Sequence, residues 1–164
     1  FAVLLADDFL TYDGEGVTYH LVHEYQKTGR IQLSVMQVDG PDISKYGVVK
    51  IDKKTGLVQG LIEKPEYKDA PSNLASIGRY ILSPDIFDIL RNQPVGSGGE
   101  IQLSDAIDIQ AKAGIVDSLI LNGERFDCGG VSGYIEAIKY IAARDGNFWT
   151  LVYNLMIHEL VYFN

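Results

Sequence analysis

The sequence predicts an α/β domain in which helices flank a mixed, mostly parallel sheet. Short apolar runs typical of strands alternate along the chain with segments whose apolar residues recur at helical spacing. Turns containing glycine or proline separate these segments, and no repeat or low-complexity stretch interrupts them. The length of 164 residues, with 46% apolar and 22% charged residues, is typical of one globular domain with a sizeable core.

Seven segments are predicted as strands because each is apolar or alternating for a few positions and ends at a turn signal. The first of them, at residues 2–5, is entirely apolar and is expected to be buried, with a loop after it. The turn DKKTG at residues 52–56 joins two of the strands into a hairpin. The strands are expected at residues 2–5, 31–38, 46–51, 57–63, 74–82, 116–121 and 125–127.

Four segments with apolar residues at helical spacing are predicted as helices. Gly29 is placed to end the first helix, because helices often stop at a residue with a positive φ. Ser83 is placed to cap the second helix, and Pro84 fits its first turn. The helices are expected at residues 17–26, 85–91, 102–112 and 133–144.

The charge and the cysteine content exclude several classes of partner and site. A net charge of −8 argues against a nucleic-acid partner, which would need a basic surface. The single cysteine, Cys128, allows neither a disulfide within the chain nor a zinc site of four cysteines, and it fits a reducing, cytoplasmic setting. The start of the chain lacks the basic region and the cleavage site of a signal peptide.

The apolar segment at the end of the chain, residues 145–164, is predicted as a C-terminal helix or tail outside the domain of residues 1–144. It is short for a membrane span and carries polar residues, among them His158 and Glu159. We therefore expect it to pack on the domain or on another subunit, with no membrane partner.

Carboxylates follow predicted strands at two places where a ligand would be expected in an α/β sheet. Asp7 and Asp8 come directly after the first strand, and Asp127 follows the last one. Carboxylates at strand ends suit Mg²⁺, which prefers oxygen ligands. On the motif alone, a helix cap or a solvated loop is the simpler explanation of the first pair, and a helix start explains Asp127 equally well.

Glu63 and Lys64 follow a third strand and precede Pro65. A lysine there suits a phosphate group, and a glutamate suits sugar hydroxyls. Pro65 is expected to restrict Lys64 to extended geometry. A surface ion pair before a turn is the simpler alternative.

The order of several motifs resembles the bacterial UTP–glucose-1-phosphate uridylyltransferases, or UDP-glucose pyrophosphorylases, of the sugar nucleotidyltransferase family. The motifs are LLADD, SKYGVV, LIEKP, APSNLASIGRYILSPDIFDIL, GGEIQLSDAI and FDCGGVSGY, and they cover the chain from Phe1 to about Arg144. The resemblance implies a Rossmann-like nucleotidyltransferase fold. It also implies Mg²⁺-dependent transfer of UMP from UTP to glucose 1-phosphate, which gives UDP-glucose and pyrophosphate.

The resemblance assigns roles to five residues by position. Asp7 and Asp127 match the Mg²⁺ ligands, and Lys64 matches the residue that binds the sugar phosphate, so these three are the expected catalytic residues. Glu63 matches the residue that binds glucose hydroxyls. Gly47 matches the glycine whose backbone approaches the sugar.

The family's amino-terminal, nucleotide-binding segment has no counterpart in the sequence, so residues 1–144 are expected to be the sugar-binding and carboxyl-terminal part of one domain. We expect this chain alone to be inactive and to assemble into a homo-oligomer through an open sheet edge and the apolar tail. A thymidylyl- or cytidylyltransferase and a non-catalytic module that binds sugar phosphates are the alternative readings.

Overall fold

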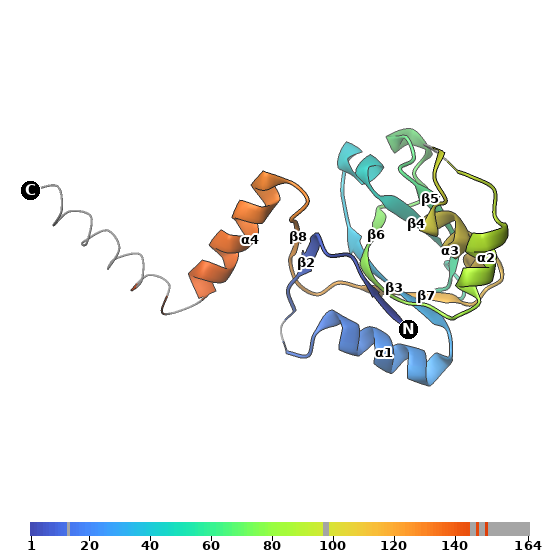
Figure 1. Cartoon of the computed structure of the whole chain (residues 1–164), viewed down its shortest axis with the longest axis horizontal. Helices are drawn as coiled ribbons and strands as arrows, with labels where there is room; N and C mark the ends of the chain where they lie inside the picture. Colours follow the sequence, from blue (N-terminus) through green and yellow to red (C-terminus); the bar gives the residue numbers. More distant parts are fainter. Residues whose placement is uncertain (13, 97–98, 145–146, 148–149, 151–164) are drawn as a thin grey trace, which may run out of the picture. The chain divides into compact units, whose positions relative to one another are not determined.

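The computed structural model describes residues 1–12, 14–96, 99–144, 147 and 150, and these fall into two compact units. Unit 1 contains Phe1–Ala6 and Leu10–Glu124, and unit 2 contains Asp7–Phe9 and the chain from Arg125. Each unit is described by itself below, with the element labels of Figure 1.

Unit 1 is built on a mixed sheet whose strands follow the order β5-β4-β6-β3-β7, with β1 paired to β6. β3 and β7 run parallel, whereas the pairs β1–β6, β3–β6, β4–β5 and β4–β6 are antiparallel. The strands of this sheet are β1 (Ala2–Leu4), β3 (Ile31–Gln37), β4 (Gly47–Ile51), β5 (Val58–Glu63), β6 (Leu74–Ile81) and β7 (Val116–Ile120).

The predicted mixed sheet with flanking helices is confirmed, but the expectation of mostly parallel strands is wrong for the strand pairs described here. A short turn can join only antiparallel neighbours, whereas a parallel pair needs a long crossover. The turn at residues 52–56 therefore makes β4 and β5 a hairpin, as predicted.

Helices cover both faces of this sheet (Figure 1). α1 (Val17–Thr28) packs its buried Leu21 against Ile81 of β6 on one face. α2 (Ile86–Asn92) and α3 (Leu103–Lys112) pack on the other face, where Ile86 and Ile107 join the larger core cluster. Short 3-10 helices, η1 (Pro41–Lys45) and η2 (Tyr67–Asp69), complete the unit.

The helix and strand positions in unit 1 agree with the predictions to within two residues at each end, and Gly29 ends α1 with a φ of 67°. Two details are wrong. β1 is mostly exposed, with 55% of Leu4 accessible, because β1 pairs only with β6 and lies at an edge. The Ser83 hydroxyl does not cap α2. It accepts a hydrogen bond from Gln110 Nε2 instead.

Unit 2 is a two-stranded sheet followed by a helix. β2 (Asp8–Leu10) pairs with β8 (Arg125–Asp127), and α4 (Val131–Arg144) follows. The ring of Phe126 packs between those of Phe9, at 6.0 Å, and Tyr140, at 5.0 Å. The expected loop after residue 7 is a strand, because Asp8–Leu10 pairs with β8 and the Phe9 ring contacts the Phe126 ring.

Apart from residues 147 and 150, the predicted tail at 145–164 lies outside the described residues. Within the described part, no helix has the length and apolar character needed to cross a membrane.

Candidate functional site

Gly47 and Glu63 are partners across the β4–β5 ladder, at the end of the hairpin opposite its turn. A Cβ on Gly47 would lie 3.1 Å from Glu63 Oε2 and 3.4 Å from Leu61 Cδ1. The absence of a side chain at position 47 therefore leaves room for the Glu63 carboxylate, which is half-buried beside the strand backbone. The structure brings these two predicted residues together.

Lys64 leaves β5 with a φ of 45°, the only positive φ among the described non-glycine residues. The predicted extended geometry before Pro65 is therefore wrong. The Lys64 N–H donates a hydrogen bond to the Tyr46 carbonyl at 3.0 Å, so the ladder continues one residue beyond Glu63 while the chain turns away. Backbone strain of this kind concentrates at ligand sites, because surrounding contacts must maintain it.

The Lys64 side chain lies beside that of Glu63 and is exposed to solvent. Its Nζ lies 4.0 Å from Glu63 Oε1, and 65% of the Lys64 side chain is exposed against 31% of Glu63. At this distance and exposure the pair contributes little to stability. An ammonium group and a carboxylate are thus presented side by side, which suits a ligand carrying both an anionic group and hydroxyls.

In unit 2, the structure brings Asp7 and Asp127 together around Gly129. The Cys128 N–H donates to the Asp7 carbonyl at 2.7 Å, and the Gly129 N–H donates to Asp127 Oδ1 at 3.1 Å. A Cβ on Gly129 would lie 3.2 Å from Asp127 Oδ1 and 3.2 Å from Asp7 Oδ2. One oxygen of each carboxylate therefore faces the same small space, which the glycine leaves open.

This space fits Mg²⁺ in the type of its donors. Mg²⁺ binds through one or two carboxylates and completes its octahedron with water and phosphate oxygens. Asp7 and Asp127 are both exposed, so water and phosphate can reach them. Among the described residues, no group of three or more His, Cys, Asp or Glu side chains is placed to hold a metal ion, so Asp7 and Asp127 are not part of a closed protein cage.

The strand-end pattern named both Asp7 and Asp8, the resemblance chose Asp7, and the structure places the two side chains differently. The Asp8 side chain is 6% exposed and pairs with Arg125 Nη2, whose own side chain is 12% exposed. Asp7, one residue earlier, is exposed beside Gly129. Asp8, the first residue of β2, is therefore buried in its pair with Arg125, whereas Asp7 lies in the turn before the strand and is left for a ligand.

Arg125, to which sequence reasoning gave no role, lies between a buried and an exposed aspartate. Its Nη2 lies 3.8 Å from Asp127 Oδ2 and also contacts Asp8 Oδ1. The two-residue spacing in the sequence could have indicated that Arg125 lies near Asp127, because residues 125 and 127 share one face of a predicted strand.

A second missed residue, Asp108, attaches α3 to β5. Its Oδ1 accepts a hydrogen bond from the Leu61 N–H at 2.9 Å, and its Oδ2 lies 2.5 Å from Lys112 Nζ. A Cβ on Gly60 would lie 3.1 Å from Asp108 Oδ1, so the glycine permits this approach. The signal in the sequence was a glycine inside a strand, which often marks a close contact.

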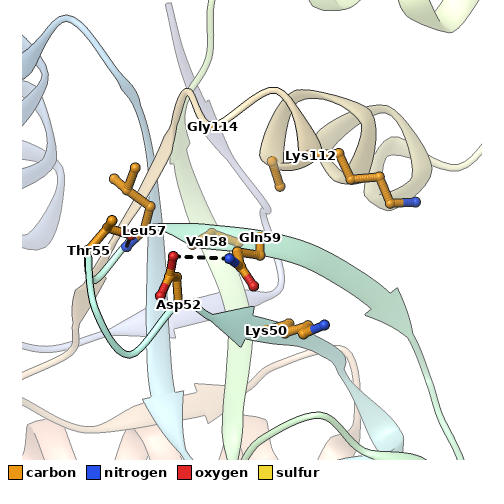
Figure 2. A pocket seen from close by; sticks show the side chains of 9 residues that line it. Lys50, Asp52, Thr55, Leu57, Val58, Gln59, Lys112 and Gly114 are labelled. Carbon is orange, nitrogen blue, oxygen red and sulfur yellow. Dashed lines mark hydrogen bonds between the residues drawn. The ribbon is translucent and has the colours of Figure 1, made fainter.

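A hollow of about 340 Å³ opens at the turn end of the β4–β5 hairpin, next to the end of α3 (Figure 2). Asp52 accepts a hydrogen bond from Gln59 across it, at 3.0 Å. Glu63 lies at the other end of β5, so this hollow is separate from the predicted sugar site. The lining residues are Lys50, Asp52, Thr55, Leu57, Val58, Gln59, Ala111, Lys112 and Gly114.

Comparison with known proteins confirms the resemblance inferred from the motifs. The chain is 49% identical over 144 residues to a protein from Pseudomonas aeruginosa named UTP–glucose-1-phosphate uridylyltransferase, which covers 85% of this chain and 52% of that protein. A protein of the same name from Staphylococcus saprophyticus is 40% identical over 148 residues, covering 88% of this chain and 51% of the relative.

Solved structures show the same likeness in three dimensions. A UDP-glucose pyrophosphorylase crystallised with UDP-glucose superposes with a TM-score of 0.81 at 41% identity, covering 88% of this chain and 56% of that one. A UTP-bound enzyme from Acinetobacter baumannii superposes with a TM-score of 0.79 at 31% identity, covering 96% and 55%.

The chain thus spans about half the length of the curated relatives it matches. The family model described as nucleotidyl transferase matches residues 1–144, which is most of the chain. We conclude that this chain belongs to the nucleotidyl transferase family.

Proposed function

We propose that this chain is the sugar-phosphate-binding and carboxyl-terminal part of a UTP–glucose-1-phosphate uridylyltransferase. The observation that carries the proposal is the 49% identity over 144 residues to a relative of that name. The arrangement of Gly47, Glu63 and Lys64 supports it, because it offers a carboxylate and an ammonium group at one exposed strand end.

The proposed reaction joins two anionic substrates. A phosphate oxygen of glucose 1-phosphate forms a bond to the α-phosphorus of UTP, and the bond from that phosphorus to the pyrophosphate oxygen breaks. The products are UDP-glucose and pyrophosphate, and no covalent enzyme intermediate is needed. The protein must therefore hold both substrates in line and offset their charge.

At the proposed sugar site, different residues of the chain bind the phosphate and the sugar hydroxyls. Lys64 Nζ provides a positive charge for the phosphate of glucose 1-phosphate, and the Glu63 carboxylate accepts hydrogen bonds from sugar hydroxyls. Gly47 leaves space for the Glu63 carboxylate, and its bare backbone is the assigned point of approach for the sugar ring. The turned backbone at Lys64 sets the direction in which its side chain leaves the strand end.

On the metal side, Asp7 and Asp127 would hold Mg²⁺ through one carboxylate oxygen each. When bound, Mg²⁺ would neutralise phosphate charge that develops in the transition state. The Gly129 N–H fixes one Asp127 oxygen, so that carboxylate is oriented before any cation arrives.

We test the proposal by calorimetric titration of the chain with glucose 1-phosphate and with UDP-glucose, with and without Mg²⁺. We expect both ligands to bind and Lys64→Ala to weaken both by about tenfold, as for the loss of one charge-assisted hydrogen bond. Lys68→Ala is the matched control, because Lys68 is an exposed lysine of the same unit, 75% accessible, that pairs with Glu66. Absence of binding, or equal loss in both variants, would refute the sugar-site assignment.

The same preparation tests the alternatives and the remaining expectations. Because the chain spans about half of the relatives' length, we expect binding without turnover, and pyrophosphate release from UTP and glucose 1-phosphate by this chain alone would contradict that. Preference for dTDP-glucose or CDP-glucose over UDP-glucose would favour a thymidylyl- or cytidylyltransferase. We also propose a cytoplasmic homo-oligomer, and a monomeric mass in sedimentation would argue against the assembly.

A further inference from the structure

We propose that Asp8 acts as a positioning residue that holds the Arg125 guanidinium away from Asp127, so that the Asp127 carboxylate stays available to a divalent cation. This inference rests on the proposed metal-binding role of Asp7 and Asp127. It assigns a function to a buried ion pair, Asp8 with Arg125, that the proposed reaction does not itself use.

Two carboxylates surround the same guanidinium in unit 2. Arg125 Nη2 contacts Asp8 Oδ1 directly and lies 3.8 Å from Asp127 Oδ2. The Asp8 and Arg125 side chains are 6% and 12% exposed, whereas the Asp127 side chain is 60% exposed. The buried carboxylate is therefore the main partner, and the exposed one is left at a distance too long for a hydrogen bond.

The geometry of β2 and β8 keeps Arg125 paired with Asp8 and separate from Asp127. Arg125 and Asp127 lie two residues apart on β8, so their side chains leave the same face of the strand. Asp8 reaches the guanidinium from β2, the strand paired with β8. The Gly129 N–H restrains Asp127 from its other side by bonding Oδ1.

Neutralising Asp8 alone would change which carboxylate the Arg125 guanidinium contacts. A buried guanidinium that loses its ionised partner is costly, so the Arg125 side chain would move toward the nearby Asp127 carboxylate. A guanidinium bonded to Asp127 competes with a cation for the same oxygens and adds a repelling charge. Asp8→Asn is therefore expected to weaken cation binding although residue 8 does not touch the cation.

The test uses Mn²⁺ as the probe, because its paramagnetism allows free and bound ion to be counted by electron paramagnetic resonance without any turnover. We expect Asp8→Asn to weaken Mn²⁺ binding to the chain by about tenfold, as is usual for residues that position metal ligands. The double variant Asp8→Asn/Arg125→Met removes the competing guanidinium as well, and we expect its affinity to equal or exceed that of the wild type.

A matched control comes from unit 1, where Arg30 Nη1 and Asp117 Oδ2 lie 3.4 Å apart in a partly buried pair. Asp117→Asn removes a similar ion pair that does not involve Asp127, so Mn²⁺ binding should remain unchanged. Circular dichroism and urea unfolding of each variant establish that the folded protein is being titrated.

The outcomes separate this inference from the proposed function. If the wild type binds no Mn²⁺, the metal role of Asp7 and Asp127 fails. If the wild type binds and Asp8→Asn binds equally well, the positioning role of Asp8 fails. It also fails if the double variant is as weak as Asp8→Asn, since removing the guanidinium should then have restored binding. Should Asp8→Asn alone not fold, Asp8→Asn/Arg125→Lys takes its place: its retained positive charge should weaken Mn²⁺ binding relative to Asp8→Asn/Arg125→Met, and equal affinity of these two variants would overturn the inference.

Discussion

The Leu61 backbone N–H donates a hydrogen bond to Asp108 Oδ1 at 2.9 Å and thereby attaches α3 to β5. β5 ends two residues later at Glu63. A helix on one face of the sheet therefore restrains the strand that presents the predicted sugar-binding carboxylate, through one side-chain contact that an interior glycine allows.

Asp108→Ala should lower the free energy of unfolding by about 1–3 kcal/mol, because the partly buried Leu61 N–H is left without its acceptor. Urea unfolding measures the loss. Asp88→Ala is the control, since it removes an exposed helical partner of Arg91 and should cost about 0.5 kcal/mol or less. Equal losses in the two variants would show that the contact between α3 and β5 is not a stabilising one.

Gly47→Ala should weaken binding of glucose 1-phosphate by about tenfold while the chain remains folded. The added methyl group would lie 3.1 Å from Glu63 Oε2 and displace that carboxylate from its position beside β4. Calorimetric titration gives the affinity. Gly16→Ala provides the comparison, because a Cβ on Gly16 meets nothing within 4 Å and should leave binding intact.

Lys64→Gly should leave the free energy of unfolding unchanged or raise it by up to about 1.6 kcal/mol. Removing the strain of a left-handed φ of 45° should raise the free energy of unfolding by about 1–2 kcal/mol. The greater conformational entropy of glycine in the unfolded chain should lower it by about 0.4–1 kcal/mol. Lys50→Gly, within β4, should instead lower it by about 0.5–1 kcal/mol. Similar destabilisation in both variants would contradict the assignment of strain to Lys64.

The pKa of Asp52 lies below its ordinary value of 3.8, chiefly because the Lys54 backbone N–H donates to its carboxylate, with Gln59 as a further donor. A lowered folded pKa means that these bonds stabilise the fold at pH values above 3.8 and cease to do so as the pH falls through the folded value. Carbon-13 NMR titration of Asp52 Cγ should show a midpoint below 3.8. Gln59→Leu should move this midpoint part of the way back toward 3.8, and an unshifted wild-type midpoint would contradict the prediction.

Hydrophobic spacing and turn residues were sufficient to locate the helices and most strands of unit 1. They did not determine strand direction, because an apolar run has the same spacing in a parallel and an antiparallel ladder. They also missed β2, whose three residues are stabilised by the rings of Phe9 and Phe126 from distant parts of the sequence.

The candidate site was predictable as residue types and less so as geometry. Asp7 and Asp127 were expected at strand ends and do converge, as do Gly47 and Glu63. The conformation of Lys64 was predicted wrongly, because the preference of a residue before proline was overridden by a tertiary hydrogen bond to the Tyr46 carbonyl. Preferences of single residues are weak against contacts of this kind, which sequence spacing does not reveal.

Asp7 and Asp127 come from distant stretches of the chain, with nearly all of unit 1 between them. During synthesis a ribosome releases Asp7 early and Asp127 only after the sheet of unit 1 has emerged. A product cut short before β8 would retain Gly47, Glu63 and Lys64 but lack the carboxylate pair. On the proposed roles, divalent-cation binding would therefore require translation through β8, whereas sugar-phosphate binding would not.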